Sequence, residues 1–245
     1  MTVNWNEKGA VSQPKDQGSC GSCWAFTTAA TMESLAVISG QFKEVPSFSM
    51  QQLLDCDKSN DGCDGGWMYK AYAYTSTHGL MDYDGYAYKG VADHNKCLFD
   101  EKKVMFKNVG MKQEKSLSND ALKAILMKQP VGVGIFTNSN FQFYKSGVMT
   151  EETLKCSSPD NSVNHGVTVV GYGKSATAEE KKACEEYWVV RNSWGSKWGE
   201  EGFFKLCMDG TGAKSQPYGI CQLNRFPTYP TMDAHPVETE ILYSE

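Results

Sequence analysis

The sequence lacks the features that mark membrane proteins and nucleic-acid-binding proteins. None of its apolar runs approaches the roughly 18 consecutive residues of a membrane helix, and the longest candidates, such as residues 130–136, have the length of a buried strand. The 24 Lys and Arg residues form no stripe and are outnumbered by 29 Asp and Glu residues, which gives a formal net charge of −5. This balance provides no electrostatic footprint for phosphate groups. We therefore expect neither a membrane nor a nucleic-acid partner.

Internal repeats, low-complexity linkers and an N-terminal signal peptide are missing as well. We expect a mature domain cut from a longer precursor, with Met1 as a remnant of expression. The composition, 40% hydrophobic and 22% charged, is ordinary for a globular protein. A chain of 245 residues can form one large domain or two smaller ones that share an interface.

The first half of the chain has helical periodicity. A helix is expected over 23–38, with its apolar residues on roughly one face and Gly40 placed to end it. Ser49 and Gln52 form a capping box that predicts the start of a second helix. Residues 65–79 predict a third.

The second half changes to β periodicity. After one helix at about 119–128, short runs rich in valine and aromatic residues predict strands of a sheet or barrel at 130–136, 165–173, 187–194 and 202–208. The change of period places a seam near 110–115. The acidic end of the chain is expected to form a surface-laid or disordered tail.

Nine cysteines are an odd number, so four bridges leave one thiol, which suggests an oxidising compartment; unrelated buried thiols are the alternative. Cys20 and Cys23 lie three residues apart and could form a redox pair, half a zinc site, or one bridge cysteine beside one reactive thiol. A thioredoxin-type site is disfavoured because Trp24 follows the pair and no strand precedes it. A zinc site, or any metal site, is disfavoured because there is no second such pair and the four histidines are scattered, at His78, His94, His165 and His235.

The reactive-thiol interpretation has a physical basis. Cys23 lies in the first turn of an expected helix, where unpaired N–H groups and the helix dipole stabilise a thiolate. A thiolate nucleophile needs an imidazole, and His165 begins a β run beside Gly166. Asn192 could accept the imidazole N–H, and Trp194 could keep water away from that bond. The alternatives are a structural histidine and a simple turn with a core tryptophan.

Four motifs occur in one order along the chain: QGSCGSCWAF at 17–26, GCDGG at 62–66, NHGV at 164–167 and NSWGSKWGEEGF at 192–203. Together they resemble the papain family of cysteine proteases, the group of papain and the L-type cathepsins, over roughly residues 4–230. The resemblance implies an α+β, papain-like two-domain fold, with a helical domain, an antiparallel β-barrel domain and the active-site cleft between them. The implied boundaries are 12–112 for the helical domain, 1–11 with 113–230 for the barrel domain, and 231–245 for a tail.

The resemblance also implies catalytic roles. Cys23 is the expected nucleophile, His165 its imidazole partner, Asn192 the group that orients the imidazole, and Trp194 a shield for that contact. Gln17 is expected to supply a donor to the oxyanion. The implied reaction is hydrolysis of internal peptide bonds through a thiolate–imidazolium pair and a thioester acyl-enzyme, with no cofactor or metal. A non-catalytic peptide- or partner-binding protein and a related acyl transferase remain as alternatives.

The resemblance assigns substrate-binding residues too. Gly65 and Gly66 are expected to pair with an extended substrate. A hydrophobic pocket without a carboxylate is expected to take the side chain two before the cut. Phe226 is expected at its floor, unless the alignment slips by one and Arg225 enters, or both residues only pack the end of the barrel. The complete set is Gly65, Gly66, Trp67, Met68, Gly134, Val163, Asn164, Gly166 and Phe226.

The disulfide pairs implied by family position are Cys20–Cys63, Cys56–Cys97 and Cys156–Cys221. Cys184 and Cys207 flank stretches expected to be neighbouring strands, so we predict a fourth bridge between them, with two free thiols as the alternative. The charged loop 173–186 is expected to be solvated. The family also implies peptide or protein substrates, an own propeptide, cystatin-type inhibitors, a monomer, and a lysosomal, vacuolar or secreted location. No paired-histidine occluding loop is visible, which favours an endopeptidase.

Overall fold

The computed structural model describes residues 2–158, 160, 162–208 and 217–233. The tail expected over 231–245 therefore lies outside the described residues, apart from 231–233. None of the helices within the described part is long and apolar enough to cross a membrane.

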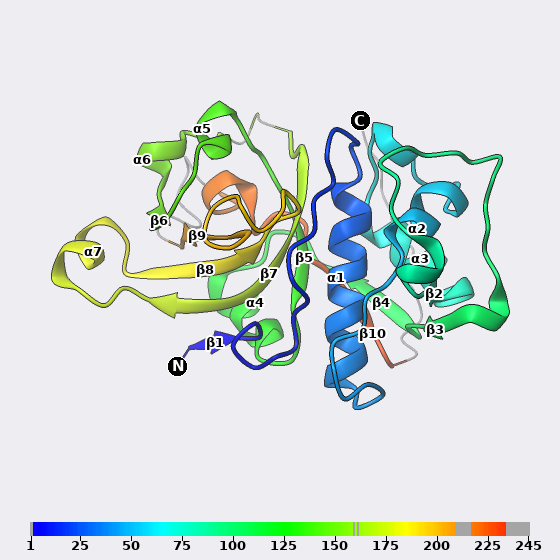
Figure 1. Cartoon of the computed structure of the whole chain (residues 1–245). Helices are drawn as coiled ribbons and strands as arrows, with labels where there is room; N and C mark the ends of the chain where they lie inside the picture. Colours follow the sequence, from blue (N-terminus) through cyan, green and yellow to red (C-terminus); the bar gives the residue numbers. More distant parts are fainter. Residues whose placement is uncertain (1, 159, 161, 209–216, 234–245) are drawn as a thin grey trace.

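The chain folds into a helical half and a sheet half, mainly on the right and left of Figure 1, with the sheet strands β4 and β10 reaching to the right of α1. The helical half comprises α1 (Cys23–Ile38), α2 (Met50–Cys56), η1 (Gly62–Asp64), α3 (Met68–His78), β2 (Leu80–Met81), η2 (Asp84–Tyr86), η3 (Glu101–Lys103) and β3 (Val104–Phe106). The sheet half comprises β1 (Val3–Asn4), β4 (Gly110–Gln113), α4 (Asn119–Leu126), β5 (Val131–Ile135), α5 (Ser139–Gln142), β6 (Val148–Met149), α6 (Glu151–Leu154), β7 (His165–Lys174), α7 (Ala178–Ala183), β8 (Glu186–Arg191), β9 (Phe203–Cys207), η4 (Ile220–Gln222) and β10 (Thr228–Thr231).

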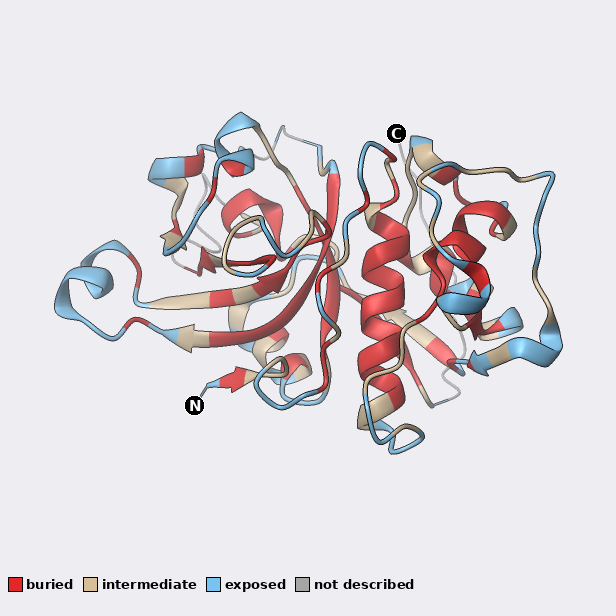
Figure 2. Cartoon of the chain, in the orientation of Figure 1, coloured by how far each residue is buried: buried red, intermediate tan, exposed pale blue. Residues whose placement is uncertain are grey.

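Helix α1 has the expected bounds but not the expected single buried face. Every residue from Trp24 to Ala36 is buried, and Figure 2 shows α1 buried between the two halves. The one-face expectation was wrong because α1 contacts α2 and α3 on one side and β5 and β7 on the other. The hydroxyl groups of Thr28, Thr31 and Ser34 donate to backbone carbonyls within the helix. For example, Thr28 Oγ1 donates to the Trp24 carbonyl at 2.8 Å.

Two other helix starts differ in detail from the sequence expectation. Ser49 caps α2 by accepting the backbone N–H of Gln52, but the Gln52 carboxamide does not return the bond; it donates to the Gly79 carbonyl instead. The third helix begins at Met68 rather than at residue 65. Gly65 has a φ of 125°, which a helix cannot accommodate.

The sheet half is built on eight strands in the order β4-β10-β5-β7-β8-β9-β6, with β1 paired to β7. All pairs are antiparallel except β6–β9, which is parallel and departs from the all-antiparallel expectation. The four predicted strand runs correspond to β5, β7, β8 and β9. The register places Ile135 opposite His165, at the end of β7 that meets α1.

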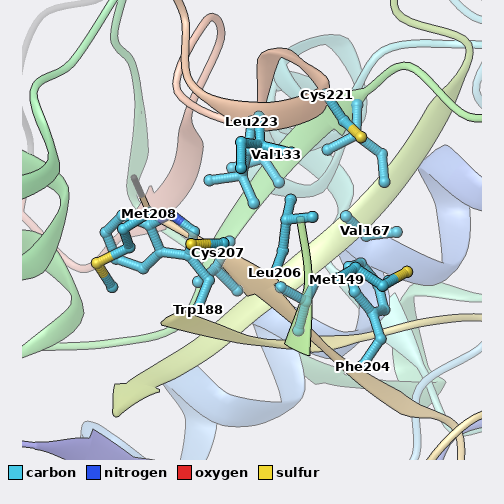
Figure 3. Close-up of a cluster of buried hydrophobic side chains, with 14 of the residues drawn as sticks. Val133, Met149, Val167, Trp188, Phe204, Leu206, Cys207, Met208, Cys221 and Leu223 are labelled. Carbon is cyan, nitrogen blue, oxygen red and sulfur yellow. The ribbon is translucent and has the colours of Figure 1, made fainter. Parts of the chain in front are cut away.

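Each half has its own hydrophobic core. The larger core lies on the sheet, where side chains of β5 to β9 and η4 meet; Figure 3 labels Val133, Met149, Val167, Trp188, Phe204, Leu206, Cys207, Met208, Cys221 and Leu223. The second core packs α1, α2 and α3 around Trp24, Phe48 and Tyr72. On this division of the core we propose the domain boundaries given above, 12–112 and 1–11 with 113–230.

The N-terminal segment contacts both halves before it reaches α1. Val3 and Asn4 pair with β7. Farther along, the buried Arg191 side chain donates to the carbonyls of Ser12 at 3.0 Å and Gln13 at 2.9 Å, while Ser12 Oγ donates to the Glu33 carboxylate on α1. This segment therefore connects the end of β8 to the central helix.

Four disulfide bonds join the pairs Cys20–Cys63, Cys56–Cys97, Cys156–Cys221 and Cys184–Cys207, which are the pairs expected from the sequence. Cys23 is the one free cysteine. The Cys184–Cys207 bridge connects the residue after α7 to the end of β9, next to the charged loop. That loop carries the exposed helix α7, as Figure 2 shows.

Replacing Cys184 and Cys207 together with alanine is expected to lower the free energy of unfolding by roughly 2–4 kcal/mol, because the bridge closes a loop between residues separated by 23 positions. Urea denaturation followed by circular dichroism measures the change. A Lys181→Ala variant alters the same loop without removing the bridge and serves as the control. An unchanged unfolding midpoint in the double variant would show that the bridge contributes nothing to stability.

Candidate active site

The free thiol lies where α1 and β7 meet. Cys23 is the first residue of α1, and the backbone N–H of Gly166 on β7 donates to its Sγ at 3.3 Å. A Cβ at position 166 would lie 3.4 Å from Met68 Sδ and 3.5 Å from the Cys23 carbonyl carbon, so a small side chain there would make ordinary van der Waals contacts with both. The contact brings together two residues that belong to different halves of the chain.

The imidazole beside this contact is held by an amide. His165 Nε2 and Asn192 Oδ1 are 2.7 Å apart, and both residues are buried. The Trp194 ring lies 4.9 Å from the imidazole, centroid to centroid. Phe141 on α5 packs edge-on against Trp194 at 5.5 Å, a contact that no sequence signal indicated. Because Nε2 is engaged, Nδ1 is the ring nitrogen that remains available to the thiol.

Gln17 is held beside the same cavity by both ends of its carboxamide. Its Nε2 donates to the Cys20 carbonyl at 2.9 Å, and its Oε1 accepts from Ser193 Oγ at 2.6 Å. These two bonds fix the orientation of the carboxamide and leave its second N–H unused. Sequence reasoning missed Ser193, whose only signal was its place between Asn192 and Trp194 in the motif.

Burial disfavours an isolated charge on either reactive group. Burial raises the pKa of the Cys23 thiol, while hydrogen bonds from backbone N–H groups, that of Gly166 first, lower it. Burial lowers the pKa of the His165 imidazole to about 4, and the hydrogen bond to Asn192 acts in the opposite direction. A charge on one group therefore requires a compensating charge on the other.

Cys23, His165 and Gln17 line one cavity of about 370 Å³ between the two halves. Eight of the nine substrate-binding residues expected from the sequence line this cavity. Its lining residues are Gln17, Gly21, Cys23, Asp64, Gly65, Gly66, Trp67, Met68, Gly134, Val163, Asn164, His165 and Gly166. Gly21 and Asp64 were missed, although both lie inside quoted motifs. Within the described residues, no cluster of His, Cys, Asp and Glu could hold a metal ion.

Phe226 is not part of this lining. Its ring packs edge-on against Trp67, one of the lining residues, with centroids 5.9 Å apart. Arg225 does not enter the cavity either. Its guanidinium lies 4.8 Å above the Tyr218 ring and donates to Gln222 Oε1. The expectation that Phe226 forms the pocket floor therefore stays a prediction.

The fold and this cavity define a two-domain α+β protein in which a free thiol and an imidazole from different halves share one cleft. Residues 1–231 match the family model described as papain family cysteine protease. The chain belongs to the papain family of cysteine proteases.

Individual relatives agree with this membership. The chain is 37% identical to vignain of Phaseolus vulgaris over 94% of its own length and 59% of that protein, so it spans about six tenths of this curated relative. Among solved structures it is similar to the bromelain protease of Ananas comosus in complex with the E64 inhibitor, with 33% identity, a TM-score of 0.80, and coverage of 95% of this chain and 99% of that one. It is also similar to digestive procathepsin L 3 of Tenebrio molitor, with 35% identity, a TM-score of 0.79, and coverage of 94% and 69%.

Proposed function

We propose that the protein is a cysteine endopeptidase. The observation that carries the proposal is the contact at the domain interface, where the Cys23 thiol accepts the Gly166 N–H next to an imidazole held by Asn192. Both reactive groups line a cavity large enough for an extended peptide segment. Family membership supports peptide-bond hydrolysis as the reaction.

The resting state is proposed to be a thiolate–imidazolium pair. Burial disfavours each charge alone, as the pKa shifts of Cys23 and His165 show. Transfer of the thiol proton to His165 creates both charges together, so each stabilises the other. The N-terminus of α1 and the Gly166 N–H further stabilise the thiolate, and Asn192 Oδ1 accepts a hydrogen bond from the imidazolium.

The reaction then takes two stages. The Cys23 thiolate attacks the carbonyl carbon of the peptide bond, and a carbon–sulfur bond forms while the carbonyl oxygen becomes an oxyanion. The carbon–nitrogen bond breaks, and His165 gives its proton to the leaving amine. A water molecule that loses a proton to the neutral imidazole then attacks the thioester, releasing the acid and restoring the Cys23–His165 pair.

The unused N–H of Gln17 is proposed to stabilise the oxyanion together with the backbone N–H of Cys23. Gln17 is buried and its carboxamide orientation is fixed by Ser193 and Cys20, so this donor is in place before the substrate arrives. A preorganised donor of this kind lowers the barrier without reorganisation during the reaction.

The cavity wall supports a preference for a hydrophobic side chain two residues before the cut. Met68, Val163 and the Trp67 ring supply apolar surface at one end of the cavity. The Phe226 ring packs edge-on against the Trp67 ring of that wall. At Gly134, a Cβ would lie 3.3 Å from Val163 Cγ2, so a larger residue would narrow the pocket.

The similar solved structures support proposals about binding partners, and the disulfide bonds support a proposal about location. We propose that peptide or protein substrates, an own propeptide and cystatin-type inhibitors bind this cleft in a monomeric enzyme. The bromelain structure is a complex with the E64 inhibitor, and the Tenebrio molitor structure is a procathepsin. Four disulfide bonds favour a lysosomal, vacuolar or secreted location, because such compartments preserve disulfides.

Brief alkylation at pH 5 with limiting iodoacetamide tests the ion pair. A free thiol with an ordinary pKa near 8.5 is almost fully protonated at that pH and reacts little. We expect a single adduct on Cys23, located by intact mass and peptide mapping, and its loss in a His165→Ala variant. No adduct on Cys23 would contradict the ion pair and favour a protein that binds peptides without cutting them.

A second experiment separates hydrolysis from acyl transfer. An amine nucleophile is added during turnover, and the products are compared with those formed without the amine.

A further inference from the structure

A tyrosine outside the cavity lining bonds to both segments of the proposed oxyanion site. The Tyr88 hydroxyl donates to the main-chain carbonyl oxygen of Gln17 at 2.7 Å, and it lies 2.7 Å from Ser22 Oγ. Gln17 carries the proposed side-chain donor, and Ser22 directly precedes the nucleophile Cys23. Because Tyr88 does not line the cavity, it can influence a substrate there only through the residues that it holds.

The direction of these two hydrogen bonds follows from the chemistry of the partners. A carbonyl oxygen only accepts, so the single Tyr88 proton goes to Gln17, and Ser22 Oγ donates to the Tyr88 oxygen. Burial raises the pKa of the half-buried Tyr88 hydroxyl above its ordinary value of about 10, against the opposing effect of the Ser22 hydrogen bond. The hydroxyl therefore keeps its proton, and with it the bond to Gln17, at neutral and acidic pH.

The helical half holds the Tyr88 ring in place. The ring packs edge-on against Phe26 on α1, with centroids 4.8 Å apart. The next residue, Lys89, donates its backbone N–H to Gln51 Oε1 on α2 at 2.8 Å. The Tyr88 hydroxyl is therefore fixed relative to α1, the helix that begins at the nucleophile.

The first turn of α1 positions one of the two proposed oxyanion donors. The Ser22 carbonyl accepts the backbone N–H groups of Ala25 at 2.9 Å and Phe26 at 3.1 Å. These bonds hold the backbone at Cys23, whose N–H is the donor, without any contribution from Tyr88.

The other donor depends on contacts to both halves of the chain. The backbone N–H of Gln17 donates to the Ser193 carbonyl at 2.9 Å, and its Oε1 accepts from Ser193 Oγ, so Gln17 is attached to the sheet half. The main-chain carbonyl of Gln17 is attached to the helical half by Tyr88. The Tyr88 bond therefore sets where the main chain of Gln17 lies relative to α1.

We propose that Tyr88 is a positioning residue for the oxyanion site. It fixes the main chain of Gln17 relative to α1, and it thereby sets the spacing between the Gln17 side-chain donor and the Cys23 N–H. Two donors stabilise one oxyanion best when both lie at hydrogen-bond distance from it, so a shift of either donor weakens binding of the transition state. The inference rests on the proposed endopeptidase function and assigns to it a residue outside the cavity lining.

Tyr88→Phe tests this role because it removes the hydroxyl and keeps the ring that packs against Phe26. We expect kcat for a fluorogenic peptide to fall about fivefold, the effect of losing one ordinary hydrogen bond, with KM unchanged. The rate of Cys23 alkylation by iodoacetamide at pH 5 should also be unchanged, because the Tyr88 hydrogen bonds involve neither the thiol nor the imidazole. Thermal unfolding verifies that the variant is folded at the assay temperature.

A double-mutant cycle separates positioning of Gln17 from a general structural effect. Adding Tyr88→Phe to Gln17→Ala is expected to lower kcat no further, because no side-chain donor remains to be misplaced. Tyr74→Phe is the matched control. Tyr74 is also a half-buried tyrosine of the helical half, and its hydroxyl accepts a hydrogen bond from Gln52 at 3.2 Å without lining the cavity, so this variant should keep the wild-type kcat.

The outcomes distinguish this inference from the proposed function. An unchanged kcat in Tyr88→Phe, or a further fall of about fivefold in the Gln17→Ala background, would overturn the positioning role and leave the endopeptidase intact. Slower alkylation of Cys23 in Tyr88→Phe, or an equal fall of kcat in Tyr74→Phe, would assign the effect to the ion pair or to any lost hydroxyl and would also overturn it. Failure of the wild-type protein to cut either the peptide or casein would instead contradict the proposed function.

Discussion

Replacing Cys23 with alanine is expected to lower kcat/KM for a peptide substrate by on the order of 10⁴-fold or more, because no acyl-enzyme can form without the nucleophile. Cys23 is the one free cysteine, so within the described residues no second thiol can replace it. Its Sγ accepts a hydrogen bond from the Gly166 N–H and forms no disulfide, so the substitution should leave the fold intact. Fluorogenic peptide hydrolysis measures the loss, and thermal unfolding verifies the fold.

The same variant distinguishes an enzyme from a peptide-binding protein. Cys23→Ala keeps the cavity lining and should therefore bind a peptide substrate without cutting it, which fluorescence anisotropy detects. A Cys23→Ala protein that still hydrolyses peptide at the wild-type rate would show that another group performs the reaction. A wild-type protein that binds the peptide as stably as the variant, with no cleavage, would favour the non-catalytic alternative.

Replacing Gln17 with alanine is expected to lower kcat by about 10²–10³-fold, because the proposed oxyanion loses one of its two preorganised donors. The effect should fall on kcat rather than on KM, since the oxyanion develops only in the transition state. Steady-state kinetics over a range of substrate concentrations separates the two constants. Alkylation of Cys23 at pH 5 should remain, because the Gln17 carboxamide bonds to the Cys20 carbonyl and Ser193 rather than to the thiol.

An exposed glutamine provides the control for this second substitution. Gln41 lies just beyond α1 and far from the cavity lining, and Gln41→Ala is expected to keep wild-type kinetics. A Gln17→Ala variant with unchanged kcat and raised KM would contradict the oxyanion role and assign Gln17 to ground-state substrate binding. Loss of the Cys23 adduct together with kcat would instead show that the substitution disturbed the ion pair.

Much of the local structure was predictable because it depends on local patterns. The start of α1 at Cys23 and the strand runs of β5, β7, β8 and β9 followed from periodicity and from glycine or serine boundaries. The burial of α1 on all sides was not predictable in this way. It arises from packing against the sheet and the other helices at once, and those contacts join residues distant in sequence.

The residues of the candidate active site also fall into those that the sequence could predict and those that it could not. Cys23, His165 and Asn192 could be proposed because their chemistry and motif context are specific. The roles of Ser193 and Phe141 could not, because a serine hydroxyl and a phenyl ring acquire meaning only from the groups they contact across the fold. The edge-on contact of Phe226 with Trp67 likewise depends on how the chain returns after η4, which residue counting along the sequence does not determine.

The order in which the strands pair has a consequence for synthesis in the cell. The first residues of the chain, Val3 and Asn4, pair with Tyr172 and Gly171 on β7, and α1 is covered on one side by that same strand. A ribosome delivers residues in sequence, so the N-terminal segment and the nucleophile emerge long before their partners. The thiol and the imidazole therefore cannot meet on a short nascent chain. We expect a protease of this topology to be inert until its polypeptide has been made at least as far as Asn192, which holds the imidazole.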